Sequence, residues 1–178
     1  MPKYERAPKT VNDLANDIMV GCTEHKPLLD AKVKIDFVFA YADEDQDGNP
    51  RNFAVKHHGR RLFGQARIIK TKERVLGRGD AEILLDANWW GGVTEQKQRA
   101  LLDHELTHLV VRTDKFGRFD FDDLHRPMLK LRLHDHEFGW FASIAKRHGA
   151  DSIECEQAHR MMTEAGQFYW PGIVEKRK

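Results

Sequence analysis

Apolar and polar residues follow two different periods along this chain, and these periods predict helices and strands in separate segments. Apolar residues at helical spacing predict a helix over Val11–Cys22. Alternation of apolar and polar residues then predicts a strand with one buried face over Val33–Phe39. Leu62–Ile69 and Ala81–Ala87 have the composition of two further short strands. The first half of the chain is therefore expected to supply most of a sheet.

Helical spacing dominates the second half of the chain. Thr94 is a suitable N-cap, and the leucines that follow it predict a long helix that ends near Arg112. The stretch Phe116–Leu133 contains a glycine break and alternating leucines, which is typical of a hairpin. A further helix is expected over Asp135–Arg147, with Gly149 just beyond its end.

The last predicted helix has its own start signal. Asp151 and Glu154 form a capping box, which predicts a helix from there to about Ala165. The predicted order is helix, strands, long helix, hairpin, helix and helix. This order favours an α+β fold, in which a small mixed sheet packs against the long helix and the further helices.

Length and composition indicate one globular domain. With 178 residues, 40% of them hydrophobic, the chain is long enough to bury one sizeable core. We expect a single domain over residues 1–178, with its core at about 33–149 and a C-terminal helix and tail at 150–178. The net charge of +1 gives no overall attraction to nucleic acid or to a membrane, and no apolar run approaches the roughly 18 residues of a membrane span. A cytoplasmic monomer is the default expectation.

One motif within the predicted long helix gives the chain a candidate chemistry, His104-Glu105-Leu106-Thr107-His108. Two histidines four residues apart lie on one face of a helix, one turn above the other, so both imidazoles can reach one ion. Zinc suits them, because imidazole is a good zinc ligand and a catalytic zinc takes three protein ligands plus water. Glu105 would lie beside the metal, where its carboxylate could take a proton from zinc-bound water and pass it to a leaving amine.

A zinc site needs a third ligand, and several downstream residues could supply it. His134 is favoured, because a short hairpin can return it to the first helix, where Asp135 could orient it. His136 is the next candidate. Asp114 and Glu137 also remain open, since each stands near a position that an extended metallopeptidase pattern uses.

The residues around these two motifs resemble a known family. A helix with Leu-Leu-Asp-His-Glu-Leu-Thr-His, followed after a hairpin by His134-Asp135-x-x-Phe138, resembles the phage metallopeptidase family and is similar to the SprT-like zincins. The resemblance covers about Val33–Gly149. It implies a minimal zincin-like fold that binds zinc through His134 as the third ligand. It also implies that an edge strand before the metal helix pairs with an extended peptide, and Ala81–Ala87 is expected to be that strand.

Two functions are compatible with these features. The first is a zinc-dependent endopeptidase that acts on a protein or peptide substrate, with Glu105 as base and His104, His108 and His134 as zinc ligands. The second is a non-catalytic, zinc-stabilised module that contacts nucleic acid through the basic segment 51–78. The presence of Glu105 favours the first, because a structural zinc site has no need of a base. The family resemblance implies the cytoplasm of a bacterium or of a phage-infected cell.

Overall fold

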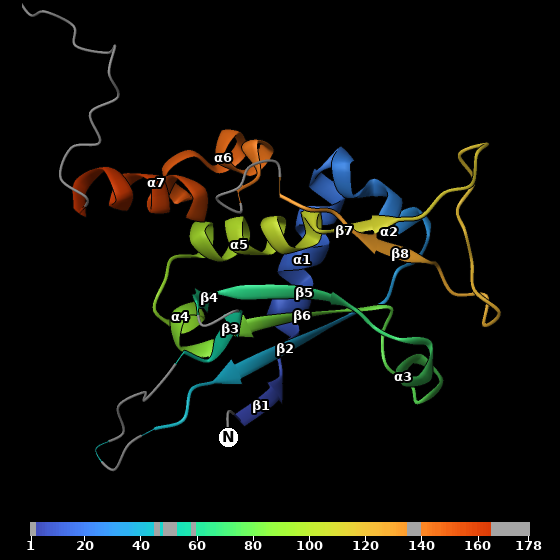
Figure 1. Ribbon diagram of the computed structural model, residues 1–178, viewed down its shortest axis with the longest axis horizontal. Coiled ribbons are helices and arrows are strands. Elements are labelled where there is room, and N and C mark those ends of the chain that lie inside the picture. The colour runs from blue at the N-terminus through green and yellow to red at the C-terminus, as the bar shows by residue number, and fades with distance from the viewer. Residues whose placement is uncertain (1–2, 45–46, 48–52, 58–59, 135–139, 165–178) are drawn as a thin grey trace, which may run out of the picture.

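Helices cover one face of a four-stranded mixed sheet (Figure 1). The computed structural model describes residues 3–44, 47, 53–57, 60–134 and 140–164. Helices and strands are mixed along the chain rather than arranged in regular βαβ units. The predicted α+β architecture with a small mixed sheet is therefore confirmed.

The sheet has the strand order β1-β2-β6-β5. Its members are β1 (Lys3–Arg6), β2 (Ile35–Tyr41), β6 (Ala81–Asp86) and β5 (Gly64–Ile68). The two central strands, β2 and β6, are parallel, whereas β1 and β5 run antiparallel to their neighbours. The first and last strands in this order are the two edges of the sheet.

The expectation that Ala81–Ala87 forms an edge strand is wrong. Residues Ala81–Asp86 form β6, which lies between β2 and β5. Five of its six residues are buried, the charged Glu82 and Asp86 among them, which is typical of a central strand with a neighbour on each side. The edge that lies against the metal-motif helix belongs instead to β5, which includes Gly64 and Ala66.

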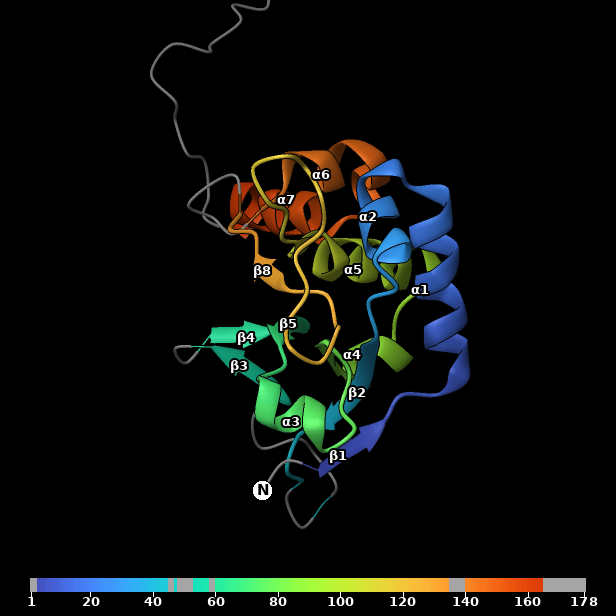
Figure 2. The ribbon, with the colours of Figure 1, turned by 90° about the vertical axis from the view of Figure 1, so that its right-hand side faces the viewer.

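Two long helices, α1 (Lys9–Gly21) and α5 (Glu95–Thr107), pack on the covered face of the sheet. Two more, α6 (Ala142–His148) and α7 (Ile153–Glu164), lie on the far side of α5 (Figures 1 and 2). The core joins the inward side chains of the sheet to the apolar stripes of α1 and α5, and it includes Phe37, Phe39, Ile83, Leu85, Val11, Ala15, Ile18, Leu101, Leu102 and Leu106. Because α5 has protein on both sides, three of its polar residues, Asp103, Glu105 and Thr107, are buried as well as its leucines.

Two predicted helix boundaries are wrong. The helix α5 ends at Thr107 rather than near Arg112, because the β-branched run that follows forms β7 (Leu109–Val111) and pairs with β8 (Leu129–Leu131). The helix expected from Asp135 is described only from Ala142 onward, since 140 and 141 are not helical and 135–139 lie outside the described residues.

The predicted capping box at the start of the last helix is also wrong. The hydroxyl Oγ of Ser152 accepts a hydrogen bond from the amide of Cys155 at 3.1 Å, so Ser152 caps α7 in place of Asp151. Glu154 does not reach back to the helix start. Its side chain is buried between α5 and α7.

Short elements connect the core elements. They are η1 (Thr23–His25), α2 (Lys26–Asp30), β3 (Val55–His57), β4 (Arg60–Leu62), α3 (Thr71–Val75), α4 (Ala87–Gly91) and η2 (Gly149–Asp151). Within the ranges that the structure describes, no helix is both long and apolar enough to cross a bilayer.

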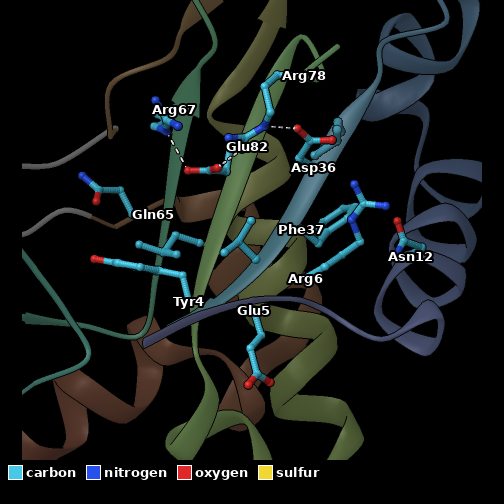
Figure 3. Close-up of a pocket in the computed structure, with 13 residues that line it drawn as sticks. Tyr4, Glu5, Arg6, Asn12, Asp36, Phe37, Gln65, Arg67, Arg78 and Glu82 are labelled. Carbon is cyan, nitrogen blue, oxygen red and sulfur yellow. Dashed lines mark hydrogen bonds and ion pairs between the residues drawn. The ribbon is translucent and has the colours of Figure 1, made fainter. Parts of the chain in front are cut away.

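The other face of the sheet carries charged and apolar side chains and is only partly covered. The β3–β4 hairpin packs over one end of it, and the rest forms an open pocket of about 930 Å³ (Figure 3). Arg67 Nε donates to Glu82 at 2.6 Å, and Arg78 Nε donates to Asp36 at 2.9 Å. The charged groups on this face therefore neutralise one another in pairs.

Candidate metal centre

Three histidines converge where α5 ends and the chain leaves β8. His104 lies in the last turn of α5, His108 is its C-cap residue, and His134 follows β8. Their ligand nitrogens all lie within 4.8 Å of one another. The Nε2 atoms of His104 and His134 are 3.2 Å apart. The structure thus brings together the three residues that the sequence predicted as zinc ligands.

The donor set and its spacing fit zinc. Two nitrogens that bind one tetrahedral zinc at 2.0–2.1 Å are about 3.3 Å apart, close to the separation of the His104 and His134 Nε2 atoms. Three imidazoles are also a ligand set that catalytic zinc sites use. The spacing of His104 and His134 therefore already suits zinc, and the ligand nitrogen of His108 lies within 4.8 Å of both.

The two helix histidines are each held from behind through Nδ1. His104 Nδ1 donates to Glu154 Oε1 at 2.7 Å, and His108 Nδ1 donates to the carbonyl of Arg132 at 2.8 Å. The Arg132 amide returns a bond to the carbonyl of His108 at 2.8 Å, which fixes the strand that leads to His134. Because a carboxylate and a carbonyl only accept, both rings keep the proton on Nδ1, and each ring in its neutral form leaves Nε2 for a metal.

Phe141 packs against all three histidines. Its ring centroid lies 4.9 Å from each imidazole centroid, and its side chain is fully buried. This contact restricts the rings without supplying a polar group. The sequence motif pointed to Phe138 as the aromatic partner, and Phe138 lies outside the described residues.

The protonation of the helix histidines follows from their surroundings. Burial lowers the pKa of His108 to about 4, so its imidazole is neutral and ready to bind a metal at neutral pH. Burial also acts to lower the pKa of His104. The hydrogen bond to Glu154 and the nearby carboxylates outweigh burial, so the pKa of His104 is raised.

Glu105 is enclosed by the edge strand β5. The residue is 4% exposed, and its carboxylate accepts a hydrogen bond from the backbone amide of Ala66. A Cβ atom at Gly64 would lie 2.7 Å from its Oε1 atom, so glycine is what allows the strand to approach this closely. Burial raises the pKa of Glu105 to about 7. The carboxyl is thus able to exchange a proton near neutral pH.

We expect Gly64→Ala to push Glu105 out of its position and to lower the free energy of unfolding by about 1–3 kcal/mol, the usual result of overpacking. Chemical denaturation measures this difference. Gly21→Ala is the matched control, because a Cβ atom there meets nothing within 4 Å. The interpretation fails if Gly64→Ala costs as much in a Glu105→Ala background, where the contact no longer exists.

Asp114, the one other candidate third ligand that the structure describes, is not in the histidine group. Asp114 Oδ1 accepts from the amides of Phe116 at 2.8 Å and Arg118 at 3.0 Å, so its carboxylate closes a turn in the hairpin. His136 and Glu137 lie outside the described residues. The structure therefore gives no role in metal binding to Asp114.

Four arginines of the basic segment 51–78 pair with acidic residues. Arg61 contacts Asp86 at 3.2 Å, and Arg74 contacts Asp122 at 2.5 Å. Arg67 and Arg78 are the two arginines whose pairs occupy the open face of the sheet. These pairings reduce the positive charge that a nucleic acid would meet, so they do not favour the binding-module hypothesis.

A second group of possible metal ligands is Cys22, His25 and Asp103, and two of its members, His25 and Asp103, belong to an ion-pair network instead. Asp103 accepts from His25 Nε2 and His148 Nε2, each at 2.6 Å, and from Arg147 Nε at 3.0 Å. The guanidinium beside the carboxylate opposes the entry of a second cation. This network braces the back of α5 one residue before His104, and sequence reasoning missed it.

The fold and the histidine cluster define an α+β protein with a three-histidine candidate metal centre and a buried glutamate beside it. The family model described as "Putative phage metallopeptidase" matches residues 2–166, and the chain belongs to this family. Membership confirms the resemblance seen in the sequence and implies a metal-dependent peptidase. Searches of curated proteins and of solved structures gave no match.

Proposed function

We propose that this protein is a zinc-dependent endopeptidase with a minimal zincin-like fold, and that its substrate is a protein or peptide. His104, His108 and His134 hold the metal, and Glu105 is the general base. The observation that carries the proposal is the convergence of three imidazole nitrogens beside a buried glutamate. This glutamate lies on α5, the helix that also positions His104 and His108. Family membership independently supports peptidase activity.

Zinc bound here would polarise the scissile carbonyl and acidify a bound water. Glu105 follows His104 directly, so its carboxylate lies beside the metal ligands rather than among them. It accepts the proton from water and then delivers it to the leaving amine. The amide of Ala66 and the close backbone of Gly64 hold the carboxylate in one place during both transfers.

The free edge of β5 suits an extended peptide. The amide of Ala66 bonds to Glu105 rather than to β6. The main-chain groups of Ala66 therefore point away from β6, toward the outer edge of the sheet. The two-residue period of a strand gives Gly64 and Ile68 the same orientation. A substrate that pairs with this edge would place a peptide bond next to Glu105, with affinity from main-chain hydrogen bonds.

The number of protein ligands also supports catalysis over a purely structural zinc. The group that the structure describes has three members, as catalytic zinc sites do, whereas structural sites usually use four protein ligands. A fourth position left to water is what peptide hydrolysis requires.

The function is tested by incubating the zinc-loaded protein with a fluorescently labelled, unfolded protein substrate. We expect cleavage that 1,10-phenanthroline stops and that added zinc restores. Cleavage that persists in the chelator would point to a contaminating or metal-independent protease. If the protein binds zinc but cleaves none of several unfolded substrates, it is not an endopeptidase and the proposal is wrong.

The third ligand is tested by comparing His134→Ala with Asp114→Ala. We expect His134→Ala to weaken zinc binding by more than about 100-fold, beyond the loss typical of residues that only orient a ligand. Asp114→Ala should stay within about threefold of the native affinity, since its carboxylate closes a turn. Competition with a chromophoric chelator measures both constants. The reverse order would assign the third ligand to Asp114.

A further inference from the structure

Glu154 joins the last helix to the candidate metal centre. It lies in the first turn of α7, and its Oε1 atom is 2.7 Å from Nδ1 of His104. The residue is 2% exposed. The amide of Phe141 also points toward Oε1, at 3.4 Å. Fifty positions separate Glu154 from His104 along the chain, so only the tertiary fold brings them together.

The buried position of this carboxylate needs a reason. A negative charge in the first turn of a helix is favoured by the helix dipole even when the side chain stays in water. Glu156 shows this alternative, since it lies in the same turn and pairs with Lys97 at the surface at 2.9 Å. Burial of a carboxylate costs several kcal/mol unless a partner compensates. In the described part of the chain Oε2 of Glu154 has no hydrogen-bond partner, so compensation comes mainly through Oε1 and His104.

We propose that Glu154 is a positioning residue of the metal centre. It holds the Nδ1 proton of His104, and so fixes both the ring orientation and the tautomer whose Nε2 faces His134 and the metal. This inference rests on the proposed function and adds α7 to the active site. A carboxylate behind a metal-binding histidine also makes the imidazole a stronger ligand.

The two helix histidines therefore have different supports. His108 donates to the neutral carbonyl of Arg132, whereas His104 donates to a charged side chain. A charged acceptor forms the stronger hydrogen bond, and its negative charge offsets part of the charge of a bound zinc. Loss of Glu154 should consequently weaken metal binding without removing any ligand.

The helix α7 has other contacts that hold it in place when Glu154 is changed. Ile153 packs on the main core, and Ser152 caps the helix. Trp140 Nε1 donates to Gln157 Oε1 at 2.8 Å. Together with the Lys97 pair, these contacts allow Glu154→Gln to fold with α7 in its native position.

The test compares zinc binding by native protein, Glu154→Gln and the matched control Glu156→Gln, each measured by competition with a chromophoric chelator. We expect Glu154→Gln to raise the zinc dissociation constant by about 10–100-fold and Glu156→Gln to change it less than about twofold. A second readout is the ¹H–¹⁵N signal of His104 Nδ1–H in the zinc-loaded protein. It should lie downfield in the native protein and in Glu156→Gln, and should move upfield in Glu154→Gln, where the acceptor is neutral.

Equal zinc affinity of the native protein and Glu154→Gln, with an unmoved His104 signal, would show that Glu154 only packs the helix and would overturn the inference alone. Failure of the native protein to bind zinc would overturn the proposed function together with it. If Glu154→Gln does not fold, Glu154→Asp keeps the charge but shortens the reach by one methylene. Its zinc affinity should fall, and unchanged affinity would contradict the positioning role.

Discussion

Replacement of Glu105 by glutamine is expected to abolish peptide hydrolysis while zinc remains bound. Glutamine has nearly the same shape and can still accept the hydrogen bond from Ala66, but it cannot take a proton from water. Loss of a general base typically lowers kcat by about 10²–10⁴-fold. Initial rates on a labelled unfolded protein, together with zinc per chain in the same samples, measure both parts of the prediction.

Glu95→Gln is the matched control for this experiment. Glu95 is the first residue of the same helix, and its side chain is 68% exposed. The control therefore removes a surface carboxylate that lies far along the helix from Glu105. Activity of Glu95→Gln should equal that of the native protein. If Glu105→Gln keeps more than about a tenth of the native kcat, another group acts as the base and the assignment of Glu105 is wrong.

The second large effect concerns stability rather than catalysis. Asp103→Asn should lower the free energy of unfolding at pH 7 by about 3 kcal/mol, the lower end of the range for breaking a buried ion pair. Asp103 is 2% exposed and accepts from His25, His148 and Arg147. The lower end applies because Arg147 is partly exposed and keeps a second pair with Glu24.

The stability lost in Asp103→Asn should depend on pH, and the sign of this dependence follows from the pKa of Asp103. Burial alone would raise the pKa of Asp103, but hydrogen bonds from His148, His25 and Arg147 outweigh burial and hold the pKa far below its usual range. A depressed pKa stabilises the folded state above the unfolded value of about 3.9, and this stability is lost as the pH falls toward the folded value. The difference between native protein and Asp103→Asn should therefore shrink below about pH 4.

Urea denaturation between pH 7 and pH 3 measures this difference. Asp17→Asn is the control, because Asp17 is an exposed residue of α1. This change should lower the free energy of unfolding by less than about 0.5 kcal/mol at every pH in this range. A gap between native protein and Asp103→Asn that widens on acidification would have the opposite sign and would show that Asp103 does not act as a buried, paired carboxylate.

The centre of the site could be predicted from sequence because its signals are local. The leucines of α5 and the spacing of His104 and His108 lie within one helix, where one period fixes both the buried stripe and the shared face. His134 could also be predicted, because the hairpin that precedes it returns the chain to the helix. The choice of His134 over Asp114 agrees with the geometry, although its role as a ligand is still a prediction.

The sheet order could not be predicted in the same way. Leu62–Ile69 and Ala81–Ala87 both have the composition of short strands, and which of them forms the edge depends on pairing between distant segments. The short apolar run Ile83–Leu85 in β6 was the available signal for a central strand. The end of α5 was missed for a similar reason, since the pairing of β7 with β8 overrides the helical spacing of Val110.

Glu154 shows how a local rule can hide a tertiary contact. Its spacing from Asp151 matches a capping box, and the rule assigned it to the helix start. Ser152 takes that role, and Glu154 turns inward to His104. Asp103 carried a weaker signal, because a carboxylate on the apolar side of a helix needs a partner that sequence alone does not identify.

The central claim is that three histidines hold one zinc and leave a position for water. An anomalous-difference electron-density map of zinc-loaded crystals, recorded at the zinc edge, tests it most directly. The account predicts one strong peak within about 2.1 Å of Nε2 of His104, His108 and His134, with the remaining contact to a non-protein oxygen. No peak at the three histidines, or a peak closed by a fourth protein ligand, would contradict it.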